Sequence, residues 1–166
     1  MALILEADFA TPDLCDDNPD VRVLHAQFRS FGRNARFCGQ AVTIKCFEDN
    51  SLVKAKVNEP GKGKVIVVDG GGSLRRALLG DQLAEKAVLN GWMGIIINGA
   101  VRDVEILASL PLGILALGVI PLKTDKRDVG LQGLPVEIGG TEINEGDWIY
   151  ADASGVVVSP RNLMSH

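Results

Sequence analysis

The chain has 166 residues, of which 46% are hydrophobic, and a formal net charge of −4 with a pI of about 5.2. This length suits one compact domain with a substantial core, so we expect a single domain over residues 1–166. No apolar run approaches the roughly 18 residues of a membrane-spanning helix, which predicts a soluble protein without a membrane partner. The acidic balance also argues against direct nucleic-acid binding, because phosphate recognition needs concentrated positive charge.

The N-terminal segment and the cysteines indicate the cellular compartment. MALILEADFATPDLCDD begins apolar but lacks the basic lead and the small-residue cleavage site of a secretory signal, so we expect a cytoplasmic protein. Cys15, Cys38 and Cys46 are odd in number and form no C-x-x-C pair. They indicate buried free thiols rather than a disulfide framework or a thiolate zinc site.

Strand-like and helix-like segments alternate through the first part of the chain. Residues 40–47, QAVTIKCF, alternate with β-branched residues and predict a strand. Residues 49–58 begin with Asp and Asn, which suit the start of a helix. Residues 65–68 predict a buried strand that runs into a glycine-rich loop. Residues 74–91, LRRALLGDQLAEKAVLNG, carry apolar residues at helical spacing and end on glycine, which predicts one long helix.

The alternation continues in the second part. Residues 92–98, WMGIIIN, predict a strand, residues 104–110 a short helix, and residues 112–118 another apolar strand. Residues 134–160 form short runs bounded by glycine, which is typical of hairpins. Helices interleaved with strands in the middle, between β-rich ends, predict an α/β fold: a mixed β/α sandwich in one domain.

The two histidines limit the possible enzyme classes. His166 is the last residue, and His25 lies in VRVLHAQF, where the alternation predicts an ordinary strand. A Ser-His-Asp or Cys-His nucleophile would need His25, which we interpret as structural. Imidazole-rich metal sites are excluded as well, so a bound metal would rely on oxygen ligands, as Mg²⁺ and Mn²⁺ do.

Two other polar stretches have simpler interpretations. VVDGGGSLRR fails the dinucleotide-binding pattern because Arg75 stands where the third glycine should be, and it also lacks the Walker lysine. It predicts a tight strand-to-helix connection, with backbone binding of a small anion as the alternative. The basic clusters at 62–64 and 123–128 are short and interleaved with glycine or acids. We expect these charged side chains to lie in loops and to be exposed to solvent.

The informative arrangement joins GDQL at 80–83 to RD at 102–103, with twenty residues between Asp81 and Arg102. One helix, one turn and one strand fit this interval, so the helix start and the strand end would meet if the two elements run antiparallel. Free N–H groups at the helix start would bind a carboxylate, and Arg102 would add a fork of donors. Asp103 would hold a hard divalent cation that stabilises an enolate as a carbon–carbon bond breaks.

Each of these residues also has a purely structural alternative. Asp81 would satisfy the helix start, and Asp103 would cap the helix that follows. Arg102 would pair locally with Asp103 or Glu105. These alternatives leave unexplained why charged groups gather at the end of so apolar a strand.

The segment GDQLAEKAVLNGWMGIIINGAVRD resembles the RraA-like family, whose aldolase members carry Asp, twenty residues, then Arg-Asp. The resemblance extends from TPDLCD (11–16) through FGRNARFCGQAVTIKCFEDNSLVK (31–54) to GDWIYADASGVVVSP (146–160). It implies a β/β/α swivelling-domain sandwich and a homotrimer. It also implies a class II, divalent-metal-dependent aldolase, a lyase that cleaves 4-hydroxy-4-methyl-2-oxoglutarate and decarboxylates oxaloacetate through the same pyruvate enolate.

The resemblance also implies roles for particular residues. It assigns contacts with the pyruvyl unit to Gly80, Asp81, Gln82 and Leu83. Arg102 would bind substrate, Asp103 would support Mg²⁺ or Mn²⁺, and Asp81, Arg102 and Asp103 would form the catalytic set. There is one departure, because Ile106 stands where aldolase relatives often carry an acid three positions after the motif aspartate. Glu105 lies one place earlier, so a water-mediated metal ligand is lost or replaced.

Three other functions are alternatives. Compact family members include inhibitors of ribonuclease E that act by protein–protein binding, and an acidic protein suits a basic, RNA-binding partner. A class I aldolase would need a buried Lys45 or Lys64 to form a Schiff base, whereas we expect both to keep solvated heads at strand edges. A methyltransferase would need an adenosine pocket, for which the sequence offers no pattern.

Overall fold

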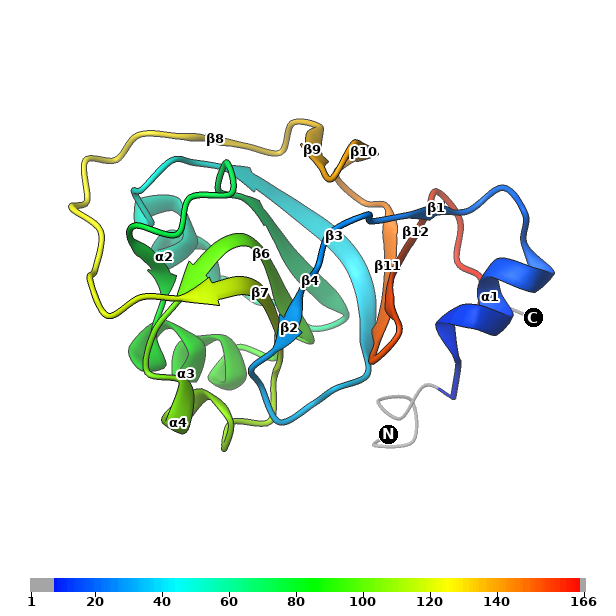
Figure 1. Cartoon of the computed structure of the whole chain (residues 1–166), viewed down its shortest axis with the longest axis horizontal. Helices are drawn as coiled ribbons and strands as arrows, with labels where there is room; N and C mark the ends of the chain where they lie inside the picture. Colours follow the sequence, from blue (N-terminus) through cyan, green and yellow to red (C-terminus); the bar gives the residue numbers. More distant parts are fainter. Residues whose placement is uncertain (1–7, 165–166) are drawn as a thin grey trace.

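The computed structural model describes residues 8–164, so His166 and the first seven residues lie outside it. Four parallel strands form the centre of a ten-stranded sheet (Figure 1). These strands are β3 (Phe37–Lys45), β4 (Lys64–Asp69), β6 (Gly94–Val101) and β7 (Gly113–Val119). Their sequences are nearly continuous apolar runs because both faces of the sheet are covered.

Strand β3 belongs to both halves of the sheet. Its first residues, 37–40, pair antiparallel with β11, and residues 40–45 pair in parallel with β4. The sheet order is β1-β12-β11-β3-β4-β6-β7-β2, with β5 on β6 and β8 on β3. The remaining sheet strands are β1 (Arg22–Val23), β2 (Arg29–Ser30), β5 (Ala77–Leu79), β8 (Leu131–Gln132), β11 (Trp148–Asp152) and β12 (Gly155–Ser159). A separate hairpin consists of β9 (Val136–Ile138) and β10 (Thr141–Ile143).

Two apolar layers cover the faces of the central strands. Side chains alternate across a strand, so Ile66 and Val68 of β4 face the helices while Val65 and Val67 face β11 and β12. The helical layer consists of α2 (Ser51–Val57), α3 (Asp81–Leu89) and α4 (Val104–Leu107), which lie on one side in Figure 1. The part of the sheet with β11 and β12, the parallel strands and the helices form three successive layers, so the predicted α/β sandwich of the β/β/α type is confirmed.

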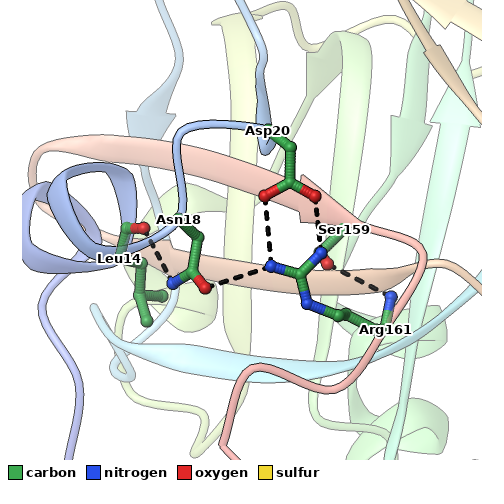
Figure 2. A network of polar contacts seen from close by, with 5 residues as sticks. All are labelled: Leu14, Asn18, Asp20, Ser159 and Arg161. Carbon is green, nitrogen blue, oxygen red and sulfur yellow. Dashed lines mark hydrogen bonds and ion pairs between the residues drawn. The ribbon is translucent and has the colours of Figure 1, made fainter.

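Helix α1 (Thr11–Asp17) packs on the outer side of β11 and β12. Thr11 donates its N–H and hydroxyl to Asp152 at 2.8 and 2.6 Å. After the helix, Asp20 and Asn18 both accept hydrogen bonds from the Arg161 guanidinium, as Figure 2 shows. These hydrogen bonds connect the N-terminal part of the described chain to its C-terminal part.

The predicted helix over 74–91 is wrong in its first third. Residues 77–79 form β5, which pairs with β6, and α3 begins only at Asp81. Ala77 also donates its N–H to Leu122 O at 2.8 Å, so β5 has backbone partners on both sides. These pairings, together with burial of all three β5 side chains, outweigh the helical spacing of the sequence.

Several other boundaries differ from those predicted. The strand expected to end at residue 98 continues to Val101, and the helix expected over 104–110 ends at Leu107. His25 is exposed and follows the two-residue strand β1 instead of lying within a strand. No helix within residues 8–164 is both long enough and apolar enough to cross a membrane.

The cysteines are free, as predicted, although only Cys46 is fully buried. Burial raises the pKa of Cys46 to about 12, with smaller contributions from the carboxylates of Asp49 and Asp69. This thiol therefore stays protonated and inert.

Candidate active site

The two segments predicted to meet do so at one edge of the sheet. Strands β5 and β6 run in parallel and end together, with Leu79 opposite Val101. Arg102 donates its backbone N–H to Leu79 O at 2.9 Å, which joins the two strand ends. Gly80 follows β5, and α3 then runs back toward the start of β6. The helix, turn and strand expected between Asp81 and Arg102 are therefore present.

Asp103 caps the start of α3 rather than the helix that follows it. Its backbone is left-handed, with φ 58° and ψ 39°, and its side chain makes no capping hydrogen bond to α4. Instead its Oδ2 accepts the Asp81 backbone N–H at 3.0 Å. The Arg102 Nε lies 3.8 Å from the same oxygen. Of the structural alternatives considered for Asp81, Arg102 and Asp103, only the pairing of Arg102 with Asp103 is seen. Its nitrogen–oxygen distance is longer than that of a hydrogen bond.

Two N–H groups at the start of α3 have no acceptor in the described part of the chain. The first intrahelical bond runs from Ala84 N–H to Gly80 O at 3.1 Å, and Asp81 N–H is taken by Asp103. This leaves the N–H groups of Gln82 and Leu83 unpaired. Free donors at the positive end of a helix dipole form a binding site for a carboxylate.

Gly80 allows the close approach of β5 to Asp103. A Cβ at this position would lie 2.7 Å from Asp103 Oδ2 and 3.2 Å from Arg102 Nε. The Gly80 backbone is extended, with φ −134° and ψ −170°, so glycine is required for space and not for its torsion angles.

A cavity of about 170 Å³ lies over this junction. All four residues of GDQL line it, together with Arg102, whose side chain is 38% exposed. The remaining lining residues are Asn50, Lys54, Ala77, Lys123 and Lys126. The cavity thus brings four cationic side chains together with a single carboxylate, that of Asp81. In a chain of net charge −4, this concentration of positive charge favours a small anionic ligand.

The cationic side of the cavity includes three lysines that the sequence did not identify. Lys123 and Lys126 belong to the cluster predicted to be solvated loop charge, and Lys54 lies on α2. All three are exposed, as predicted for the loop, yet they line the cavity. No spacing rule relates them to Arg102, because they reach the site only through tertiary folding.

Buried polar residues hold the loop that carries Lys123 and Lys126. Thr124 donates its hydroxyl to Asn50 Oδ1 at 2.6 Å, and Asn50 donates its side-chain amide to Leu78 O at 3.0 Å. The Asp49 carboxylate accepts the N–H groups of Arg127 and Val129 at 2.9 and 3.2 Å. The start of α2 therefore fixes the loop against β5.

The same contacts determine the ionisation of Asp49. Burial opposes the charged form, but hydrogen bonds from Ser51, Arg127 and Val129 outweigh it and lower the pKa of Asp49 to about 2. Asp49 is therefore an ionised structural anchor at neutral pH.

The carboxylate of Asp103 can serve as the protein ligand of a divalent cation. Within residues 8–164 there is no group of three or more His, Cys, Asp or Glu side chains that could enclose a metal. Mg²⁺ is commonly held by one or two carboxylates, with water and substrate filling its other positions. The Asp103 side chain is 33% exposed, and its Oδ1 accepts no hydrogen bond from the described residues. Ile106, at 44% exposure, adds no ligand.

The other candidate residues are not part of the site. Lys45 and Lys64 are exposed and absent from the cavity, and Lys45 pairs with Asp69 at 3.4 Å, so the buried lysine of a Schiff-base enzyme is not seen. Gly71 and Gly72 have φ of 67° and 74°, which confirms that the glycine loop needs unusual backbone angles. The loop leads to β5, however, and not directly to a helix.

Comparisons with known proteins identify the family of the chain. A family model for RraA-like proteins, described as Aldolase/RraA, matches residues 11–158. A relative from Azotobacter vinelandii, named "Putative 4-hydroxy-4-methyl-2-oxoglutarate aldolase", is 55% identical over 93% of this chain and 96% of its own length. The chain belongs to the RraA-like family.

Two solved structures share the fold closely. The RNA-processing inhibitor RraA from Thermus thermophilis is 44% identical, with a TM-score of 0.91 over 93% of this chain and 94% of that one. A protein from Geobacillus kaustophilus, titled as an S-adenosylmethionine: 2-dimethylmenaquinone methyltransferase, is 40% identical, with a TM-score of 0.93 over 95% and 99%. The names given to these relatives therefore cover an aldolase, an inhibitor and a methyltransferase on one fold.

Substituting Gly80 tests the packing of the junction. In Gly80→Ala the added Cβ overlaps Asp103 Oδ2 and displaces the carboxylate, so we expect a loss of about 1–3 kcal/mol in the free energy of unfolding. Amide hydrogen exchange should become faster at Asp81, whose N–H loses its acceptor. Gly118→Ala is the control, because its Cβ meets only the flexible end of Leu74 at 3.2 Å. Unchanged exchange at Asp81 would show that the capping bond does not depend on Gly80.

The low pKa of Asp49 predicts a pH-dependent contribution to stability. Because folding lowers this pKa from 3.8 to about 2, the contribution is complete above about pH 4 and is lost as the pH falls through 2. Asp49→Asn should lower the free energy of unfolding by about 2 kcal/mol at pH 7, and the difference from wild type should shrink toward pH 2. Urea unfolding across this range measures both effects. The exposed Asp16→Asn is the matched control, and a difference that stays constant with pH would contradict the assignment.

Proposed function

We propose that residues 1–166 act as one RraA-like domain, a class II aldolase that cleaves 4-hydroxy-4-methyl-2-oxoglutarate to pyruvate. The observation that carries the proposal is the cationic cavity lined by the start of α3 and by Arg102, beside which Asp103 is hydrogen-bonded to the Asp81 N–H. The name of the Azotobacter vinelandii relative, which matches across nearly the whole chain, supports the same reaction.

In this proposal the pyruvyl end of the substrate occupies the start of α3. Its carboxylate accepts hydrogen bonds from the N–H groups of Gln82 and Leu83, and Gly80, which also lines the cavity, contacts it. Arg102 donates to the 2-oxo oxygen, where negative charge develops as the reaction proceeds. Asp103 would hold a divalent cation, Mg²⁺ or Mn²⁺, which would supply Lewis-acid stabilisation of that negative charge.

The reaction breaks the bond between C3 and C4 of the substrate. The 4-hydroxyl group loses its proton and becomes the keto group of one pyruvate, while the electron pair of the broken bond remains on C3 as an enolate. Protonation of C3 gives the second pyruvate. Asp81, the single carboxylate that lines the cavity, orients the water that carries these protons, and Arg102 stabilises the enolate oxygen.

The same residues would serve oxaloacetate decarboxylation. Loss of carbon dioxide from oxaloacetate also leaves its electron pair on C3 of a pyruvate enolate. Arg102 and the start of α3 would contact the same part of the substrate in both reactions, so one site suffices.

We propose further that the protein acts in the cytoplasm as a homotrimer. Support for self-association comes from exposed apolar side chains near the C-terminal end of β3. Phe47, Val129 and Leu131 are 53%, 59% and 54% exposed, and Phe47 and Leu131 border one apolar hollow. Burying such side chains between subunits is favourable.

Inhibition of ribonuclease E by protein–protein binding is the second candidate function. It is favoured by the similarity to the Thermus thermophilis protein, which is named as an RNA-processing inhibitor. The overall negative charge suits a basic partner. The concentration of cations in the cavity is better explained by a small anionic substrate, which is why the aldolase is preferred.

Purified protein should release pyruvate from 4-hydroxy-4-methyl-2-oxoglutarate and from oxaloacetate when Mg²⁺ or Mn²⁺ is added, and a chelator should stop it. Arg102→Ala and Asp103→Ala should each lower kcat/KM by about 100-fold or more, because each removes a group that stabilises developing charge. Arg33→Ala and Asp16→Asn, which remove exposed charges elsewhere, are the controls.

Three results would count against this function. Activity that survives both the chelator and Asp103→Ala would exclude the metal role of Asp103. Trapping of a lysine adduct by borohydride would indicate a Schiff-base enzyme. A preparation without lyase activity that inhibits ribonuclease E would favour the regulator.

A further inference from the structure

Three lysines that line the cavity have no role in the chemistry proposed above. Lys54 comes from α2, and Lys123 and Lys126 come from the loop after β7. The cavity already has the donors that a 2-oxo acid requires, namely the α3 N–H groups and Arg102. The lysines are therefore additional positive charge in a cavity of about 170 Å³.

The loop that carries two of these lysines is fixed in place. Lys123 forms an isolated parallel bridge with Ala77, and Ala77 donates its N–H to Leu122 O at 2.8 Å. Arg76 donates its Nη1 to Lys123 O at 3.0 Å. Thr124, the residue after Lys123, is only 2% exposed and donates its hydroxyl to Asn50. Lys123 and Lys126 therefore lie on either side of the buried Thr124, on a backbone that these hydrogen bonds hold in place.

The positive charge of the three lysines is not neutralised by neighbouring acids. Asp125, the acid between Lys123 and Lys126, pairs instead with Arg76 at 3.6 Å. Among the residues that the structure describes, none of the three lysines forms an ion pair. Charges that remain unpaired beside a cavity attract an anionic ligand and raise its local concentration.

We propose that Lys54, Lys123 and Lys126 bind a second carboxylate of the substrate and make the site selective for 2-oxo acids that carry one. This inference rests on the proposed function for the orientation of the substrate, with its 2-oxo acid end at α3 and Arg102. The lysines determine specificity and take no part in bond cleavage. Their effect falls mainly on substrate affinity, and it weakens as salt screens the charges.

A matched pair of ligands tests the selectivity without requiring turnover. The probes are 2-oxoglutarate and 2-oxopentanoate, which have the same chain length and differ by the distal carboxylate. Calorimetric titration in the presence of Mg²⁺ should show that wild type prefers the diacid, and that this preference falls as ionic strength rises. In the double variant Lys123→Gln/Lys126→Gln, the ratio of the two affinities should fall by about 10- to 100-fold.

Two further variants separate charge from structure. Lys123→Arg/Lys126→Arg keeps both charges and should retain the preference for the diacid. Lys62→Gln/Lys64→Gln removes the same charge near the opposite end of the parallel strands, where Lys64 begins β4, and should also retain it. The circular dichroism spectra should show all three double variants folded, because the substituted lysines are exposed.

Equal affinity of wild type for the two acids, or an unchanged ratio in Lys123→Gln/Lys126→Gln, would overturn this inference and leave the aldolase intact. A diacid preference that these lysines control, in a protein without lyase activity, would uphold the inference and reject the proposed function. In an active enzyme, the double substitution should raise KM for 4-hydroxy-4-methyl-2-oxoglutarate more than it lowers kcat.

Discussion

The candidate site depends on one hydrogen bond, from the Asp81 backbone N–H to Asp103 Oδ2, between residues 22 positions apart. It joins the start of α3 to the second residue after the end of β6. Gly80 permits this bond, because any larger side chain would occupy the space of the carboxylate. The result is that the free N–H groups, the guanidinium of Arg102 and the carboxylate of Asp103 lie at one edge of the sheet.

A second set of contacts positions the loop after β7, whose Lys123 and Lys126 line the cavity. The start of α2 supplies Asp49 and Asn50, which hold the loop after β7 through backbone N–H groups and Thr124. Both residues are buried, at 1% and 7% exposure, and their polar groups are satisfied by that loop and by neighbouring residues of the core. An acidic protein thereby presents a locally cationic cavity, which is an arrangement that concentrates small anions.

The meeting of residues 80–83 with Arg102 and Asp103 could be predicted from the sequence, because it depends on local spacing. A helix, a turn and a strand fit between Asp81 and Arg102, so the two segments meet when the helix runs antiparallel to the strand. The alternation of apolar segments likewise predicts the sheet and the layered class. The strand at 77–79 could not be predicted, because its partners, β6 and Leu122, are distant in sequence and its helical spacing is misleading. Lys54, Lys123 and Lys126 escape prediction for the same reason, since tertiary contacts alone bring them to the cavity.

The central claim is that the start of α3 and Arg102 together bind the pyruvyl end of the substrate. A crystal structure of the protein with pyruvate and Mg²⁺ tests it most directly. We expect the pyruvate carboxylate within hydrogen-bonding distance of the N–H groups of Gln82 and Leu83, its keto oxygen facing Arg102, and the cation on the Asp103 side. Pyruvate bound instead at the glycine loop of residues 70–72, or a cation held away from Asp103, would contradict the account.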